Sequence, residues 1–210
     1  MAQKVAKTLG YVYIDTGAMY RSITWKALHE GIDFANHEAI AEIARLTTIA
    51  LIPPADLTGK QHVLVDGHDV TAEIRLPEVS QRVSGVASLP AVREVLTAQQ
   101  QAMGAAGGVV MDGRDIGTVV FPEAAVKLFV TASPEERARR RFLELRGRGI
   151  AADPDQVLAE IRDRDAQDAN RPVAPLKPAP DAIVIDTTAL DADAAFAVAL
   201  AEIGQRLAGR

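Results

Sequence analysis

The chain has 210 residues, of which 48% are hydrophobic and 24% charged, with a formal net charge of −5. These values are typical of a globular protein with one sizeable core or two small domains, and they exclude a largely disordered chain. The absence of cysteine excludes disulfides and thiolate metal sites, the four histidines show no metal-ligand spacing, and the acidic balance disfavours binding to nucleic acid.

Neither a membrane-spanning segment nor a secretory signal is indicated. Apolar runs stay shorter than the roughly 20 residues that a spanning helix needs. The first 20 residues lack a charged segment followed by an apolar stretch and a small-residue cleavage site. We therefore expect a cytoplasmic protein without a membrane partner.

The chain opens with MAQKVAKTLGYVYIDTGAMYR. Apolar residues within 2–9 lie on one helix face, Gly10 is a helix-ending signal, and YVYI at 11–14 is typical of a strand. Thr16 follows this strand. It is either the N-cap of a second helix or, with Arg21, part of a ligand site.

Three more apolar runs, at 108–112, 126–132 and 182–186, are separated by helical stretches long enough to cross over a sheet. This alternation predicts an α/β fold with a mostly parallel sheet. The stretch 48–75 differs, because short β-like runs are broken there by proline and glycine. We expect it to form a small antiparallel insert of two or three strands.

Several helices are predicted from their end signals. Residues 76–104 read as two helices that meet at Leu89–Pro90. Ser133 and Asp153 are each followed by proline and, two residues later, by Glu or Gln, which is the pattern of an N-cap. Between the helices that begin after Ser133 and Asp153 lies RGRGIAAD, a basic, glycine-containing loop of a kind that can open and close.

Candidate ligand-binding residues are concentrated in DGRDIGTVVFP, at 112–122. Ligands of open α/β sheets bind beyond the carboxyl ends of the strands, which is where Arg114 and Asp115 are expected. A turn with a surface ion pair is the alternative. In 160–172, Arg164, Asp168 and Arg171 would lie on one helix face, with a solvated surface as the alternative.

A third group is the arginine-rich run RARRRFLELRGRG, at 137–149, whose alternative interpretation is a solvated amphipathic helix. None of these groups supplies a Ser–His–Asp set, a thiol or a metal cage. Phosphoryl transfer needs no protein nucleophile, because it depends on positioning and on charge stabilisation by Arg, Lys and Mg²⁺. It is therefore compatible with this inventory.

The motifs together resemble bacterial cytidylate kinase along essentially the whole chain. Those that carry the resemblance are IDTGAMYR, DVTAEIR, SLPAVRE, MDGRDIGTVVFPEA, SPEERARRR and RDRDAQDANRPVAPL, in that order. The resemblance implies a P-loop α/β kinase fold that transfers the γ-phosphoryl group of ATP to CMP or dCMP, giving ADP and CDP or dCDP, with Mg²⁺ bound to ATP. It also implies a monomer with these small-molecule partners only.

The resemblance further implies a division of the chain. Residues 1–47 and 76–210 would form the core kinase domain, with a lid at about 137–150, and residues 48–75 the insert of the monophosphate-binding domain. The arginines of the lid that would reach the transferred phosphate are Arg137, Arg141, Arg146 and Arg148.

Site residues follow from the same motifs. Thr16 and Arg21 would receive the substrate near its base and phosphate, and Arg114 would bind phosphate. The residues implied to surround the cytosine are Ser84, Arg93, Asp115 and Arg171. Arg164 and Asp168 would lie at the ribose. Arg114 and Arg164 are the candidate catalytic residues, and we expect no metal ligand from this chain.

One element of the family is missing from this sequence. A first strand and a G-x-x-x-x-G-K-[ST] loop precede the first helix in the family, and Gly59–Lys60 does not fit that pattern. The missing strand would lie between the strands at 108–112 and 126–132. We expect the true polypeptide to start roughly 20 residues earlier. The alternative is a non-catalytic pyrimidine-nucleotide-binding remnant without an ATP cradle.

Overall fold

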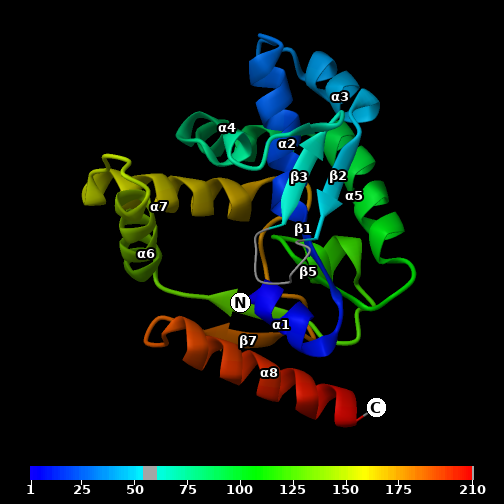
Figure 1. Ribbon diagram of the computed structural model, residues 1–210, viewed down its shortest axis with the longest axis vertical. Helices are drawn as coiled ribbons and strands as arrows, with labels where there is room; N and C mark the ends of the chain where they lie inside the picture. Colours follow the sequence, from blue (N-terminus) through cyan, green and yellow to red (C-terminus); the bar gives the residue numbers. More distant parts are fainter. Residues whose placement is uncertain (54–60, 210) are drawn as a thin grey trace. The chain divides into compact units, whose positions relative to one another are not determined.

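The computed structural model describes residues 1–53 and 61–209, which fold as two compact units. One is Ala2–Phe121, and the other is Pro122–Arg210 together with Met1. Both contain parallel strands with helices, so the expected α/β class is confirmed (Figure 1). The division into a core and a 48–75 insert stays a prediction. Gly59–Lys60, with the rest of 54–60, lies outside the described residues.

The first unit is built on a parallel pair of strands, β1 (Val12–Asp15) and β5 (Val109–Asp112), paired in a register that sets Asp15 opposite Asp112. Helix α1 (Ala2–Leu9) packs on this pair and buries Val5 and Ala6. Gly10, at φ +68°, ends the helix, because a residue without Cβ adopts this left-handed conformation without steric cost.

Helix α2 (Thr16–His29) starts directly at the end of β1 and forms the centre of the first unit. The helices α3 (His37–Leu46), α4 (Pro77–Ser88) and α5 (Pro90–Gly104) pack on it (Figure 1). Met19, Ile23 and Leu96 lie at the heart of this cluster and are fully buried. The predicted break between two helices at Leu89–Pro90 is confirmed.

Strands β2 (Ile49–Ile52), β3 (His62–Val65) and β4 (His68–Asp69) form the expected antiparallel sheet, followed by the 3₁₀ turn η1 (Glu73–Arg75). Asp66 and Gly67, both at positive φ, make the tight turn between β3 and β4. Val63, Val65 and Val70 pack with Ala18 of α2, so the sheet is anchored to the central helix.

The second unit has a parallel pair, β6 (Leu128–Thr131) and β7 (Ile183–Asp186), and the helices α6 (Pro134–Gly147), α7 (Pro154–Asn170) and α8 (Ala192–Ala208). Both predicted caps are confirmed, because Ser133 accepts from the Glu136 N–H, and Asp153 from those of Asp155 and Gln156. Helices α6 and α7 pack through a small apolar cluster.

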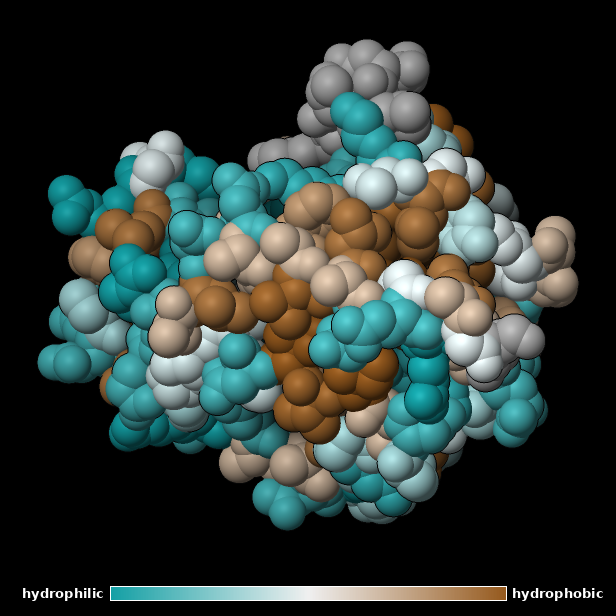
Figure 2. All heavy atoms as spheres, turned by 90° about the horizontal axis from the view of Figure 1, so that it is seen from below, coloured by the Kyte–Doolittle hydropathy of each residue, from teal (hydrophilic) through white to brown (hydrophobic). Residues whose placement is uncertain are grey.

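Apolar side chains also reach the surface. Val12 is 50% exposed on β1, and Val184 is 58% exposed on β7. Figure 2 shows one face of the molecule, with apolar residues gathered near its centre.

Among the described residues, no helix is long and apolar enough to cross a membrane.

Gly67→Ala should destabilise the first unit, because Gly67 sits at φ +84° and an added Cβ is strained there. We expect a loss of about 1 kcal/mol in the free energy of unfolding, measured in urea. The matched control is Gly85→Ala within α4, where nothing lies within 4 Å of a new Cβ. That change should stabilise the protein by about 0.5–1 kcal/mol. Equal effects of the two changes would contradict the turn assignment.

Candidate functional site

The carboxyl ends of β1 and β5 bring two of the predicted motifs together. Asp15 ends β1 and the chain enters α2 without a loop, while Asp112 ends β5 and is followed by Gly113, Arg114 and Asp115. Because the strands are parallel and in register, both motifs emerge at the same edge of the pair. This is the edge at which ligands of α/β proteins bind.

Thr16 joins the two motifs rather than capping α2. The N-cap is Asp15, whose carboxylate accepts from the Ala18 N–H at 3.0 Å, because the strand runs straight into the helix and Thr16 is already helical. The N-cap alternative for Thr16 is therefore wrong. Its hydroxyl instead donates to the Asp112 carbonyl at 2.7 Å. A Cβ on Gly113 would lie 2.3 Å from that hydroxyl, so glycine is needed for this close approach.

Arg93 and Asp115 form a buried ion pair, with only 4% and 5% of their surfaces exposed. One terminal nitrogen of Arg93 donates to Asp115 and the other to the Ala87 carbonyl at 3.0 Å. The guanidinium lies over the ring of Tyr20, 5.5 Å from its centroid. Two of the residues predicted to surround a base are thus in direct contact.

The other predicted residues of this unit are partly buried on neighbouring elements. Arg21 follows Tyr20 on α2, Ser84 lies on α4, and Arg114 lies in the loop after β5. Helices α4 and α5 both pack on α2, and the turn after Asp115 packs on α5. The first unit therefore positions phosphate-binding and base-binding candidates around one helix.

Two carboxylates lie at the same strand edge. Asp112 accepts from the Tyr13 hydroxyl at 3.0 Å, and Asp15 is 3.3 Å from Arg75. Low solvation of its carboxyl group and, next, the charge of Asp15 raise the pKa of Asp112 to about 6. Although the carboxyl group is poorly solvated, Asp112 as a residue is exposed, so solvent screens part of the repulsion.

The sequence predicts no metal ligand in this chain, but carboxylates at such an edge are the type of ligand that a magnesium ion shares with phosphate. Mg²⁺ is commonly held by one or two carboxylates together with phosphate oxygens. Asp112 and Asp15 supply such oxygens at an edge where like charge is already crowded. Among the described residues, no cluster of three or more His, Asp or Glu could hold a metal on its own. A bound phosphate group would have to complete the coordination.

The second unit places the remaining substrate-binding candidates at the end of α7. Asp168 and Arg171 are buried, and the side chain of Asp168 lies 3.8 Å from Arg164 and 3.9 Å from Arg171. Arg171 also donates to the Ala174 carbonyl, and the Leu176 N–H donates to the Asp168 carbonyl at 2.8 Å. The predicted cation–anion–cation group therefore exists, and the proline-rich connector folds back to hold it.

The predicted lid arginines all have partners within this unit. Arg137 makes two hydrogen bonds to Asp165, at 2.8 and 2.6 Å, and a third to the Ala132 carbonyl. Arg141 and Arg148 pair with Glu144, and Arg146 lies over the ring of Phe142. Arg137 thus joins α6 and the end of β6 to α7.

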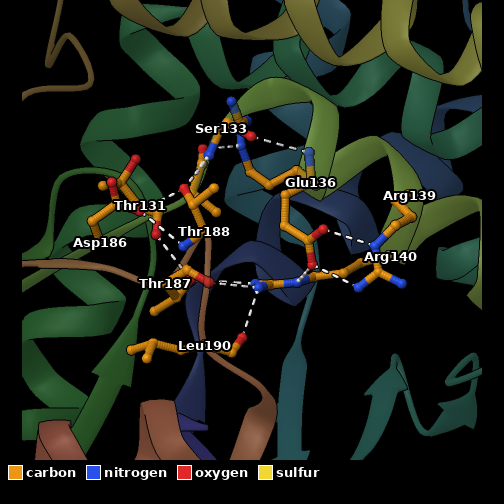
Figure 3. Close-up of polar contacts among 11 residues, drawn as sticks. Thr131, Ser133, Glu136, Arg139, Arg140, Asp186, Thr187, Thr188 and Leu190 are labelled. Atoms are coloured by element: carbon orange, nitrogen blue, oxygen red, sulfur yellow. Dashed lines mark hydrogen bonds and ion pairs between the residues drawn. The ribbon is translucent and has the colours of Figure 1, made fainter.

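Figure 3 shows a neighbouring polar network at the ends of β6 and β7. Arg140 donates to the carbonyls of Thr187 and Leu190, at 2.7 and 3.1 Å, and it also pairs with Glu136. The Thr188 hydroxyl accepts from the Ser133 N–H, which ties the start of α6 to the segment after β7. Arg140 therefore has a structural role in holding this corner together.

Four residues of the site were not singled out from the sequence: Tyr13, Asp15, Tyr20 and Asp112. Asp15, Tyr20 and Asp112 belong to quoted motifs, and carboxylates that end adjacent parallel strands are a recognisable signal. The place of Tyr20 under Arg93 could not be found from spacing, because the two residues meet only through the packing of α2 on α5.

Asp112→Asn should stabilise the protein above pH 6. The folded-state pKa of Asp112, about 6, lies above its ordinary value of 3.8, so the folded state binds the proton more tightly and loses stability as pH rises from about 4 to 6. We expect the melting temperature of the variant to exceed that of the wild type at pH 8 and to equal it below pH 4. An equal difference at all pH values would contradict the shift.

Asp69→Asn is the control, because the pKa of Asp69 is shifted in the opposite direction to that of Asp112. The Thr71 hydroxyl and N–H lower the pKa of Asp69 to about 2, which favours the folded state at neutral pH. This variant should melt below the wild type at pH 5–8, and the deficit should disappear as pH falls toward 2.

Comparison with known proteins identifies the family. A family model described as cytidylate kinase matches residues 1–205. The chain is 48% identical over 203 residues to the cytidylate kinase of Pelotomaculum thermopropionicum, covering 97% of this chain and 89% of that protein. It is 52% identical over 193 residues to that of Desulforamulus reducens, covering 92% and 85%. A bifunctional pantoate ligase/cytidylate kinase of Synechococcus elongatus matches 92% of this chain at 46% identity, over 37% of its own length. The chain belongs to the cytidylate kinase family.

Proposed function

We propose that the protein is a nucleoside monophosphate kinase that transfers the γ-phosphoryl group of ATP to CMP or dCMP. The observation that carries the proposal is the family match over nearly the whole chain, with relatives named cytidylate kinase at 45–52% identity. It is supported by the buried Arg93–Asp115 pair beside the helix that carries Thr16 and Arg21.

The reaction needs positioned charge rather than a protein nucleophile. A phosphate oxygen of CMP is itself the attacking group, so the protein has to align it and stabilise the charge that spreads over the transferred group. Arg21 and Arg114 would bind the CMP phosphate beside Thr16. Asp112, with Asp15 beside it, would hold Mg²⁺, which neutralises phosphate charge when it is bound. The arginines of the 137–148 lid would approach the donor phosphate on closure.

Cytosine would be selected by groups that match its hydrogen-bonding edge. The carboxylate of Asp115 can only accept hydrogen bonds while it is ionised, so it suits the exocyclic amino group of cytosine and repels the carbonyl of uracil. Ser84, Arg93 and Arg171 supply further polar contacts to the base. Arg164 and Asp168 would contact the ribose.

The proposal is tested by incubating the protein with ATP, Mg²⁺ and each of CMP, dCMP, UMP and AMP, and by measuring ADP formation. We expect turnover with CMP and dCMP well above that with UMP or AMP. CMP binding without turnover would favour the non-catalytic nucleotide-binding hypothesis. Failure to bind any of the four monophosphates would contradict both hypotheses.

Arg114→Ala should lower kcat/KM for every accepted monophosphate by about 10²–10³, because it removes a cation from the phosphate rather than from the base. The control is Arg82→Ala on the surface of α4, where the guanidinium lies over the ring of Phe34. The control should retain normal kinetics. A normal rate in Arg114→Ala would remove Arg114 from the site.

Arg171→Ala should raise KM for CMP and reduce the preference for CMP over UMP at least about tenfold. The matched control on the same helix is Arg162→Ala, which removes only an exposed ion pair with Glu135. Unchanged discrimination between CMP and UMP in Arg171→Ala would contradict the role given to Arg171.

A further inference from the structure

Arg75 brings a positive charge to the strand edge at which Asp15 and Asp112 end, and the proposed chemistry gives it no role. It is the last residue of η1, and its Nη2 atom lies 3.3 Å from the Asp15 carboxylate. Low solvation and the charge of Asp15 raise the pKa of Asp112 to about 6, and the charge of Arg75 acts in the opposite direction. Arg75 therefore acts on both carboxylates of this edge.

The contact with Asp15 uses only part of what the guanidinium of Arg75 can offer. Nε–H and the adjacent terminal N–H of an arginine form a fork that fits two oxygens of one carboxylate or phosphate group. Arg139 makes this full contact, with Nε and Nη2 at 2.7 and 2.8 Å from the two carboxylate oxygens of Glu136 (Figure 3). Arg75 contacts Asp15 through Nη2, at a distance longer than the roughly 2.7–2.9 Å of most charge-assisted hydrogen bonds.

The other arm of the Arg75 fork is unsatisfied. Its Nε is buried, and among the residues that the structure describes it has no hydrogen-bond partner. A buried donor without an acceptor is costly, because it has lost its hydrogen bonds to water and gained none in return. The pairing with Asp15 is therefore an arrangement that a better acceptor can replace.

Asp15 does not need Arg75 to keep its own place. Its Oδ1 atom accepts from the Ala18 N–H at 3.0 Å and caps α2, whereas its Oδ2 atom faces Arg75. Because the two oxygens have different partners, withdrawal of the guanidinium leaves the cap of α2 intact.

The backbone of Arg75 is fixed, while its side chain is free to change rotamer. Ile74 is fully buried and packs with Val70 and Ala18, and the Arg75 N–H donates to the Ala72 carbonyl at 3.1 Å. The side chain of Arg75 is 40% exposed, so it can turn without opening the core. The antiparallel sheet and η1 thus supply an adjustable cation at a fixed point of the edge.

A phosphate group bound beside Thr16 would compete with Asp15 for this cation. Thr16 directly follows Asp15, and its hydroxyl donates to the Asp112 carbonyl, so Arg75 reaches the edge at which the substrate phosphate is expected. A phosphate monoester carries more negative charge than a carboxylate, and its oxygens can accept from both arms of the fork. It offers Nε the acceptor that Asp15 does not provide.

We propose that Arg75 binds the phosphate of the nucleoside monophosphate, and that Asp15 holds its guanidinium until this substrate arrives. The inference rests on the proposed function and adds an arginine from η1 to Arg21 and Arg114. On binding, Nε and Nη2 turn from Asp15 to two phosphate oxygens. The stretch 48–75 thereby takes part in substrate recognition as well as packing on α2.

The test compares Arg75→Ala with the wild type. Dissociation constants are measured without ATP or Mg²⁺, by calorimetry for CMP and by NMR titration for cytidine, which lacks the phosphate. Arg75→Ala should weaken CMP binding about 10–100-fold and leave cytidine binding within about twofold, because only the phosphate contact is lost. An equal weakening for both ligands, or no weakening for CMP, would overturn the inference.

Two further variants define the contact. Arg75→Lys keeps the charge but not the fork, so its affinity for CMP should lie between those of Arg75→Ala and the wild type. Full wild-type affinity in Arg75→Lys would overturn the contact to two oxygens. The matched control is Arg45→Ala on α3, which removes surface ion pairs with Glu38 and Glu42 and should bind both ligands as the wild type does.

A measurement on the wild type does not depend on the folding of any variant. The NMR signal of the Arg75 Nε–H group should shift on addition of CMP and stay in place on addition of cytidine. A signal that does not respond to CMP would overturn the inference. A response to ATP instead of CMP would assign Arg75 to the donor phosphate and would overturn it as well.

The wild type also separates this inference from the proposed function. If it binds neither CMP nor cytidine, the proposed function fails and the role of Arg75 fails with it. If it binds CMP more tightly than cytidine and Arg75→Ala keeps the same ratio, only the role of Arg75 is wrong.

Discussion

The organisation of the first unit depends on the direct junction between β1 and α2. Asp15 is the last residue of the strand and, at the same time, the N-cap of the helix, so no loop separates a rigid sheet from a rigid helix. The negative charge of a carboxylate at this position also interacts favourably with the positive end of the helix dipole. As a result, the direction of α2 and the places of Thr16, Tyr20 and Arg21 are set by the register of β1 on β5.

The same junction concentrates charge. Asp15 caps the helix, pairs with Arg75 and lies opposite Asp112, whose pKa it helps to raise. Like charges on paired strands destabilise a sheet unless a cation or a donor compensates them. Arg75 and the Tyr13 hydroxyl provide part of that compensation. In the proposed function, the remaining negative charge of this edge would hold Mg²⁺ together with phosphate.

The candidate substrate-binding residues are divided between the two compact units. In the first unit, Arg93 and Asp115 form a buried ion pair, so the two charges compensate each other in the interior. In the second, the Arg137–Asp165 pair fastens α7 to α6, and the connector after α7 holds Arg171. Each unit thus preorganises its own polar groups, which lowers the entropic cost of binding a nucleotide.

Much of the fold could be predicted because its signals are local. Helix starts at Ser133 and Asp153 need only a side-chain acceptor and a proline within three residues, and the strand positions follow from short apolar runs between glycines. The N-cap of α2 was missed, because a strand that continues into a helix leaves no loop residue to mark the boundary. The family motifs indicated the candidate site residues, whose roles remain predictions.

The sequence by itself determined the α/β class, the helix caps at Ser133 and Asp153, the antiparallel insert within 48–75 and the resemblance to cytidylate kinases. Each of these depends on residues close together in the chain or on motifs that are read directly. Only the tertiary structure decided the partners of the charged groups. Arg93 meets Asp115 across 22 positions and Arg137 meets Asp165 across 28, and such pairs form only when helix packing and strand register bring distant side chains within hydrogen-bonding distance.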